Sequence, residues 1–415
     1  MTARNKNIPV LRFKGSFYDL KQFKLVDLVT FKSGGTPTKD NPSYWNGDIP
    51  WISAASMHGK YYSKSDRTIT ELGLNNGSKL APKYSLLLLV RGSMLYNKIP
   101  IGITAIDVAF NQDLKNLLVE ENVSTEFLYQ WFSAKENLLL DKVVGTGIGA
   151  GKLDTQELQN LPVSLPSLPE QQKIASFLSA IDEKIRQLTR RKELLEQYKK
   201  GVMQQLFSGK LRFKPALSGV EGDENGKAYP KWEEKKLGQI ADIFGGGTPD
   251  TSISEYWDGE IQWFTPTEIS ERFVSKSKRT ISRLGLEKSS AKLLPRGTIL
   301  FTSRATIAEL SFAIEECTTN QGFQSLVVNS ANDLNFIFYC IKCNRKAFIR
   351  KSQGSTFLEI SKTEIVKIKI HTPTLLEQIK IGNFLSSLDT KIESVSAQIA
   401  RTQEFKKGLL QKMFV

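Results

Sequence analysis

Residues 41–44 (Asn-Pro-Ser-Tyr) nearly match a loop, Asn/Asp-Pro-Pro-Tyr/Phe, that holds the exocyclic amine of a flipped adenine in enzymes that methylate DNA. Such an enzyme also needs a glycine-rich strand-loop-helix to bind S-adenosylmethionine, and we find no such segment before this string. A turn leading into Tyr44 and Trp45 is the favoured interpretation, because Asn, Pro and Ser all favour turns.

Glycines alternate with other residues from Gly145 to Gly151, just before Lys152, as in a loop that binds phosphate. A Walker A loop would need glycine where Thr146 stands and serine or threonine where Leu153 stands. The string fails at both positions. We therefore expect a flexible hinge into the helical region that follows, at which a DNA phosphate can be touched.

The residues that commonly bind metals are few and scattered. Cys340 and Cys343 have the spacing of half a zinc site, and His58 and His371 are the only histidines. We expect both cysteines to face the core of an amphipathic helix. The sequence therefore predicts no metal site and no catalytic residue in this chain.

A long internal repeat decides the architecture more than any single motif does. Gly-Gly-Thr-Pro at 34–37 returns at 246–249, and Arg-Thr-Ile at 67–69 returns at 279–281, both with an offset of 212 residues. Further along, small insertions change the offset, which reaches 207 after Pro166, but the order of the shared strings never changes. The methylase-like string and the two cysteines have no counterpart in the other copy, which further weakens their chemical interpretation.

Each copy divides into a globular part and a long helix. Near residues 20–165 and 232–372, short apolar runs are broken by Gly, Pro, Asn and Ser, which is typical of strands and short helices in an α/β (α+β) domain. Apolar residues then recur at every seventh position, which predicts a helix with a coiled-coil seam. The expected seam residues are Ile174, Ile181, Leu188, Leu195, Val202, Ile381, Leu388, Val395 and Leu409.

A helix from Pro169 to Phe207 would be roughly 58 Å long at 1.5 Å per residue, too long for one small domain to cover. Pairing of the two helices of one chain as an antiparallel coil is the simplest solution, because the polar stretch 208–231 then bridges only a short gap. Packing of each helix on its own domain, or pairing between two molecules, is the alternative. The expected parts are a first globular domain at 1–165, a spacer helix at 166–207, a linker at 208–231, a second globular domain at 232–372 and a second spacer helix at 373–415.

The composition predicts a basic protein of a reducing compartment. A formal net charge of +14 favours nucleic acid or an acidic partner. Three cysteines cannot form a disulfide framework, which points to the cytoplasm. The strongest apolar run, at 86–90, is far below the ~20 residues of a membrane span, so we expect no membrane association.

Three sets of strings carry a family resemblance. They are Leu-Arg-Phe-Lys at 11–14 and 211–214, the Gly-Gly-Thr-Pro loops, and the Pro-x-Leu-x-Glu-Gln helix entries at 166–171 and 373–378. In this order, over essentially the whole chain, the sequence resembles the specificity subunits of type I restriction-modification systems. The second copy departs from the first by a longer stretch rich in Gly and acidic residues, at 219–229, which we take as a flexible linker.

The resemblance implies a division of labour between subunits. Each globular part would be a target-recognition domain that reads one half of a bipartite, asymmetric site in double-stranded DNA, and the helices would set the distance between the halves. The implied protein partners are two adenine-N6 methyltransferase (modification) subunits and ATP-dependent restriction subunits. S-adenosylmethionine, ATP and Mg would be bound by those partners, and this chain would bind no cofactor.

Candidate DNA-binding residues are of types that suit phosphates or base edges. Residues shared by both copies are favoured as scaffold or phosphate contacts, whereas specificity is expected where the copies differ, as at 95–104 against 308–315; a solvated loop is the alternative for each. The candidates are Arg91, Tyr96, Asn97, Lys98, Asn111, Gln112, Arg304, Asn320 and Gln321. Two rival functions stay open, a self-sufficient adenine methyltransferase or fusion enzyme and a coiled-coil scaffold without a DNA role.

Overall fold

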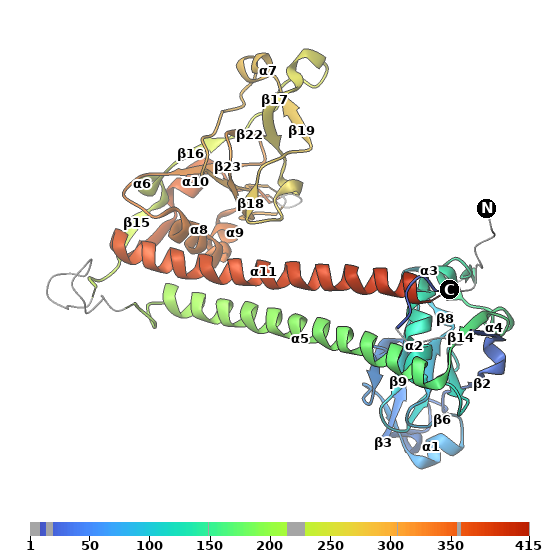
Figure 1. The fold of residues 1–415 in the computed structure, drawn as a ribbon. Coiled ribbons are helices and arrows are strands. Elements are labelled where there is room, and N and C mark those ends of the chain that lie inside the picture. The colour runs from blue at the N-terminus through green and yellow to red at the C-terminus, as the bar shows by residue number, and fades with distance from the viewer. Residues whose placement is uncertain are drawn as a thin grey trace. The chain divides into compact units, whose positions relative to one another are not determined.

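The computed structural model describes residues 9–13, 20–147, 149–213, 229–304, 306–354 and 358–414, and the chain divides into two compact units (Figure 1). Unit 1 comprises residues 1–189 and 396–415, and unit 2 comprises residues 190–395. The division falls within the two long helices, so each helix contributes one end to each unit. Most of the expected linker, residues 214–228, lies outside the described residues.

Unit 1 is built on short sheets. In order across each sheet, its strands are β2 (Val29–Ser33), β11 (Leu114–Val119), β7 (Leu86–Leu89), β9 (Ile101–Thr104) and β4 (Tyr61–Tyr62); β5 (Thr68–Ile69), β3 (Trp45–Ile52), β10 (Val108–Phe110) and β6 (Lys79–Ala81); β12 (Val144–Gly145), β13 (Gly151–Lys152) and β8 (Arg91–Gly92); and β1 (Lys21–Lys24) with β14 (Pro162–Leu165). The apolar run of the sequence forms β7, the central strand of the first sheet, and is buried along its whole length.

Unit 2 repeats this plan. Its strands, again in sheet order, are β16 (Ala241–Gly245), β23 (Gln324–Val328), β20 (Ile299–Phe301), β21 (Leu310–Ala313) and β18 (Phe273–Val274); β19 (Arg279–Ile281), β17 (Trp257–Phe264) and β22 (Cys317–Thr319); and β15 (Glu233–Lys236) with β24 (Lys369–Thr372). Strand β20 occupies the place of β7, so the internal repeat of the sequence is a repeat of topology.

Short helices cover the sheets. They begin at well-formed caps; for example, the Ser124 and Asp333 side chains accept hydrogen bonds from the third helical amide of α2 and α8. The short helices of unit 1 are α1 (Glu71–Asn75), α2 (Thr125–Ala134), α3 (Glu136–Leu140) and α4 (Thr155–Gln159). Those of unit 2 are α6 (Leu237–Ile240), α7 (Arg283–Glu287), α8 (Leu334–Cys343), α9 (Arg345–Lys351) and α10 (Lys362–Lys367).

The long helices α5 (Leu168–Phe207) and α11 (Leu375–Met413) pack antiparallel in both units (Figure 1). In unit 1, Asp182 of α5 forms an ion pair with Lys406 of α11 at 2.6 Å, and Ile174, earlier in α5, shares a core with Leu409, later in α11. In unit 2, Val202 of α5 lies in one core with residues of the first half of α11. The antiparallel pair expected from the two heptad seams and the short 208–231 stretch is confirmed.

The predicted seam residues lie on the inner side of the helices. Ile181 and Leu195 are half-buried. The others are at most 8% exposed: Ile174, Leu188, Val202, Ile381, Leu388, Val395 and Leu409.

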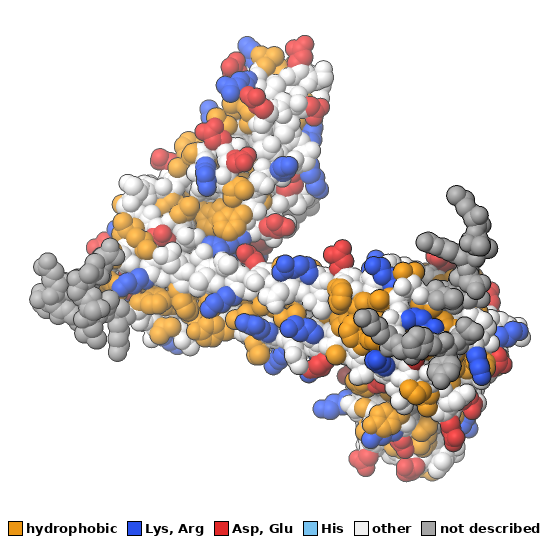
Figure 2. All heavy atoms as spheres, viewed as in Figure 1, with side chains coloured by type: hydrophobic (Ala, Val, Ile, Leu, Met, Phe, Trp, Pro, Cys, Tyr) orange, Lys and Arg blue, Asp and Glu red, His pale blue; other side chains and the backbone are white. Residues whose placement is uncertain are grey.

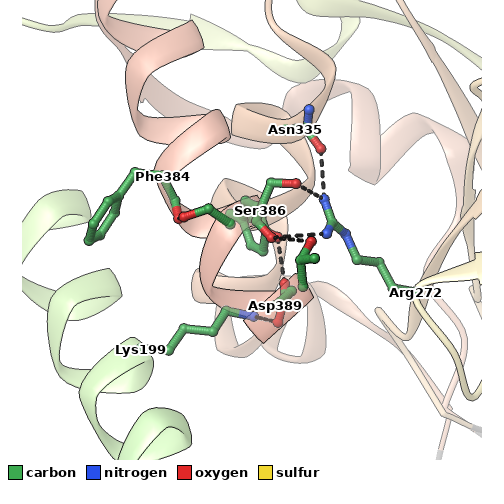
Figure 3. Close-up of polar contacts among 9 residues, drawn as sticks. Lys199, Arg272, Asn335, Phe384, Ser386 and Asp389 are labelled. Atoms are coloured by element: carbon green, nitrogen blue, oxygen red, sulfur yellow. Dashed lines mark hydrogen bonds and ion pairs between the residues drawn. The ribbon is translucent and has the colours of Figure 1, made fainter. Parts of the chain in front are cut away.

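Partly buried charged groups lie between the helices and the globular parts. In unit 2, Lys199 of α5 pairs with Asp389 of α11 (Figure 3). Asp389 also accepts a hydrogen bond from the Tyr339 hydroxyl. Unit 1 has the same arrangement, in which Lys406 and Gln130 both contact Asp182. Burial lowers the pKa of Lys199, and the Asp389 hydrogen bond partly offsets this.

Arg272 anchors the sheet of unit 2 to the long helix (Figure 3). Its terminal amino group donates to Asn335 Oδ1 of α8 at 3.0 Å and to Ser386 Oγ of α11 at 2.7 Å. In unit 1 the equivalent Lys60 donates to Ser179 Oγ of α5 at 2.9 Å. The two units therefore use a cation at the same place.

Arg272→Ala is expected to destabilise unit 2 by about 2 kcal/mol, because it removes two hydrogen bonds from a charged donor. Arg272→Lys should lose less, since Lys60 makes the equivalent contact in unit 1 with an ammonium group. Urea unfolding of the two variants and the unchanged protein measures both effects. Equal losses for Ala and Lys would contradict an anchoring role for the charge.

Candidate nucleic-acid interface

The strings shared by the two copies come together in space. In unit 1 the Thr36 hydroxyl of the Gly-Gly-Thr-Pro loop donates to Gln112 Oε1 at 2.6 Å. In unit 2 the Thr248 hydroxyl donates to Gln321 Oε1. Each loop and each Asn-Gln pair thus form one structure, although they are more than 70 residues apart in the sequence.

The loop glycines are required by close backbone approach. A Cβ at Gly34 would lie 2.3 Å from the Phe110 carbonyl oxygen, and one at Gly246 would lie 2.0 Å from that of Asn320. Trp51 closes the loop of unit 1 by donating its indole N–H to the Gly35 carbonyl at 3.1 Å. These strings recur because this packing requires them.

The two candidate asparagines are turn residues. Asn111 is only 7% exposed; its Nδ2 donates to Asp113 Oδ2 at 3.1 Å, and its Oδ1 accepts from the Asp113 amide at 3.2 Å. Asn320 Oδ1 accepts from the Gly322 amide at 2.8 Å. The glutamines that follow, Gln112 and Gln321, are exposed.

Arg91 and Arg304 occupy equivalent, exposed positions just beyond the central strands β7 and β20. In unit 1 the Val90 amide donates to the Asp113 carbonyl at 2.9 Å, and in unit 2 the Ser303 amide donates to the Gly322 carbonyl at 2.7 Å. The backbone at both arginines is thereby tied to the turn that holds the Asn-Gln pair.

The loops after the arginines differ between the units. In unit 1, Tyr96 ends a 3-10 helix, Ser93–Tyr96, and is 51% exposed; Asn97 and Lys98 follow it and are exposed as well. In unit 2 the loop is shorter and turns back through Ala308, which is buried and has a φ of 61°. The loops after the two arginines therefore differ in both sequence and structure, whereas the strands and turns that hold the arginines are the same in the two units.

The glycine-rich string of unit 1 forms the hairpin β12–β13, which pairs with β8 and places Gly151 opposite Gly92. A Cβ at Gly145 would lie 3.3 Å from the Tyr96 hydroxyl, so the hairpin reaches the divergent loop. Two residues near this site that the candidate list omitted are Lys152, opposite Arg91, and Glu359, opposite Arg304. Aligning the copies at their helix-entry offset of 207 would have paired them.

The other motifs take structural roles. Asn41 caps a 3-10 helix, Pro42–Tyr44, by accepting from the Ser43 amide at 3.1 Å, so the expected turn is present. The expectation for the cysteines is wrong in part, because Cys340 is buried but Cys343, one turn later on α8, is exposed. In the part of the chain that the structure describes, no group of three or more His, Cys, Asp or Glu side chains is placed to hold a metal ion.

These cysteines give a simple labelling test. Burial raises the pKa of both Cys317 and Cys340 to about 12, so neither forms a thiolate at neutral pH. We expect a thiol reagent to modify Cys343 alone in the folded protein and all three cysteines in denaturant. Rapid modification of Cys340 without denaturant would show that α8 is not packed as described.

A comparison with protein-family models matches residues 18–197 and 229–402 to the type I restriction modification DNA specificity domain. This chain belongs to that family. Each match covers a globular part together with most of the long helix that follows it, so the internal repeat is a repeat of the specificity domain. The expected resemblance is confirmed.

Curated relatives carry the same description. The MjaIX specificity subunit of Methanocaldococcus jannaschii is 33% identical over 195 residues, which are 46% of this chain and 45% of the relative. The EcoR124I/EcoR124II specificity subunit of Escherichia coli is 30% identical over 160 residues, or 38% of this chain and 40% of the relative. The matched part of this chain thus spans less than half the length of these two relatives.

Solved structures agree in fold over nearly the whole chain. The type I restriction-modification S subunit of M. genitalium has a TM-score of 0.60 at 16% identity and covers 98% of this chain and 99% of its own. A chain from a study of complex assembly and conformational transition of the type I system has a TM-score of 0.57 at 15% identity, covering 95% and 97%. The expectation of two α/β domains joined by two long helices is confirmed. Among the described helices, none is both long and apolar enough to cross a membrane.

Proposed function

We propose that this specificity-family chain reads a bipartite, asymmetric site in double-stranded DNA and directs adenine-N6 methylation or cleavage by partner subunits. The observation that carries this proposal is the pair of equivalent exposed arginines, Arg91 and Arg304, each at the base of a loop that differs between the units. A shared frame with divergent loops suits two related domains that read different bases.

The nine residues Arg91, Tyr96, Asn97, Lys98, Asn111, Gln112, Arg304, Asn320 and Gln321 are not equally suited to this role. Asn111 is buried in its turn, and Gln112 and Gln321 present exposed amides on the same turns. We therefore propose that the arginines and the exposed residues of the divergent loop contact DNA, while the asparagines hold the turn.

The long helices offer surface for protein partners. On α5 within unit 2, Leu194 is 49% exposed and Tyr198, four residues later on the same helix face, is 53% exposed. Figure 2 shows hydrophobic side chains gathered along α5, with Lys and Arg between them. This face supports docking of the methyltransferase subunits, which would supply S-adenosylmethionine, while restriction subunits would supply ATP and Mg chemistry.

Reconstitution tests the proposal. The purified chain should neither methylate nor cleave DNA, and methylation should appear on adding a methyltransferase subunit of this family and S-adenosylmethionine. DNA binding by that complex should weaken steeply with salt, because phosphate contacts release counterions. Methyl transfer by the chain alone would favour a self-sufficient enzyme, and a complex that does not bind duplex DNA would favour a scaffold without a DNA role.

A further inference from the structure

Lys152 of unit 1 and Glu359 of unit 2 stand at the same place. Lys152 faces Arg91 across an antiparallel pairing, and Glu359 faces Arg304 across an antiparallel bridge. The next residue confirms the equivalence, because the Leu153 amide donates to the Val90 carbonyl at 2.8 Å and the Ile360 amide donates to the Ser303 carbonyl at 3.0 Å. At the same structural position, Arg91 of unit 1 thus lies beside a cation, and Arg304 of unit 2 lies beside an anion.

The cations of unit 1 lack counter-charges. Arg91, Lys98 and Lys152 are exposed, and within the described residues none of them forms an ion pair. Like charges opposite each other across strands repel. Arg91 and Lys152 are therefore placed unfavourably in the free protein, and an anion bound between them would relieve the repulsion. A DNA phosphate supplies such an anion.

In unit 2 the arginine is held by a carboxylate. Arg304 Nε lies 2.8 Å from Glu359 Oε1, with side-chain exposures of 45% and 43%. Ion pairs this exposed add little to folding stability, so stability does not account for the pair. A carboxylate would repel a nearby phosphate. It suits a base edge instead, where the N4 amine of cytosine donates.

The geometry of the pair fits a G·C base pair. Because Arg304 uses its Nε for Glu359, its two terminal amino groups can still donate, and guanine presents O6 and N7 as adjacent acceptors in the major groove. Cytosine N4 lies next to O6 along that edge, where a carboxylate oxygen can accept from it. An arginine and a carboxylate side by side therefore match the acceptor-acceptor-donor order of this base pair.

We infer that the Arg304–Glu359 pair reads a G·C base pair in the half-site of unit 2, whereas Arg91 and Lys152 of unit 1 bind a backbone phosphate. This inference rests on the proposed DNA-recognition function. Arg91 and Arg304 are equivalent in the repeat but bind different parts of DNA. The residue opposite each arginine, Lys152 or Glu359, decides whether it binds a phosphate or a base.

The experiment uses matched alanine variants, Glu359→Ala and Lys152→Ala, each in complex with a methyltransferase subunit of this family. Affinities for the methylated motif and for its single-base-pair substitutions are measured over a range of salt concentrations. Glu359→Ala should lower discrimination at one G·C position of one half-site by about 5- to 150-fold and leave other positions unchanged. Lys152→Ala should weaken binding to all sequences alike and reduce the salt slope by about 1.

Controls separate charge from position and folding. Glu234→Ala breaks an ion pair with Lys369 in which the glutamate is 45% exposed, close to the 43% of Glu359, and it should leave discrimination unchanged. Glu359→Gln keeps the side-chain length and serves if the alanine variant fails to fold; it too should lose discrimination at the same position.

The outcomes distinguish this inference from the proposed function. If the unaltered complex shows no sequence-selective, salt-dependent binding, the proposed function fails. If that complex binds selectively but Glu359→Ala and Glu359→Gln keep full discrimination, or only bind every sequence more tightly, the reading role of the pair is overturned. Loss of discrimination by Lys152→Ala would overturn the phosphate assignment.

Discussion

Arg212→Ala is expected to destabilise unit 2 by about 3–5 kcal/mol, because it leaves a buried carboxylate without its cation. Arg212 lies against the start of α11, where its Nε is 3.0 Å from Glu377 Oε1 and its terminal amino group contacts the other carboxylate oxygen. The Glu377 side chain is fully buried. Urea unfolding of the full chain measures the loss.

Two comparisons test the cause of that loss. The double variant Arg212→Met with Glu377→Leu should be more stable than Arg212→Ala, since it buries no charge. Arg186→Ala, which breaks an exposed pair with Glu183 on α5, should change stability little. If the double variant were no more stable than the single one, the unpaired carboxylate would not be the source of the effect.

Exchange of residues 20–165 for the matching domain of another specificity subunit is expected to replace one half of the recognised DNA sequence completely and leave the other half unchanged. Each unit has its own principal hydrophobic core, so the exchange should not disturb unit 2. The core of unit 1 also includes the end of α11, where Phe414 packs on Phe127 with ring centroids 5.3 Å apart. The incoming domain should therefore keep an aromatic residue at the place of Phe127.

Sequencing of methylated adenines in cells that carry the exchanged subunit and its methyltransferase reads out both halves of the site. A matched exchange of residues 232–372 should change the other half. A change in both halves from either exchange would argue for one composite reading surface.

The repeat and the heptads were sufficient to predict the two domains and the two long helices, because both are periodic signals that residues carry locally. The antiparallel direction followed from the short polar stretch 208–231 between the first helix and the second domain. The details of the candidate interface are not local. Asn111 is buried at the end of β10, which pairs with β3 from an earlier part of the chain, and its amide donates to the Ile52 carbonyl at 3.1 Å. Lys152 and Glu359 become candidates only because each lies opposite an arginine, Arg91 or Arg304. Which distant segments pair cannot be deduced from composition.

Cys343 illustrates the same limit. Its spacing from Cys340 suggests a shared helix face, but three residues correspond to 300° of rotation in a helix of 3.6 residues per turn. Cys340 meets the core, while Cys343 lies at the edge of that face and is exposed. The burial boundary along α8 is set by its packing against other elements, which the sequence of the helix alone does not specify.

The short segment around Arg12 contacts the end of α11 in the same way as the short segment around Arg212 contacts the end of α5. The Leu211 amide donates to the Gln205 carbonyl near the end of α5, and the Leu11 amide donates in the same register to the Lys412 carbonyl near the end of α11. Arg12 then binds Glu170 as Arg212 binds Glu377. The first segment thus follows α11 in space as the second follows α5 in sequence. A permuted gene that joins 414 to 9, and so keeps the buried Phe414, and opens the chain between 214 and 228 should encode the same fold.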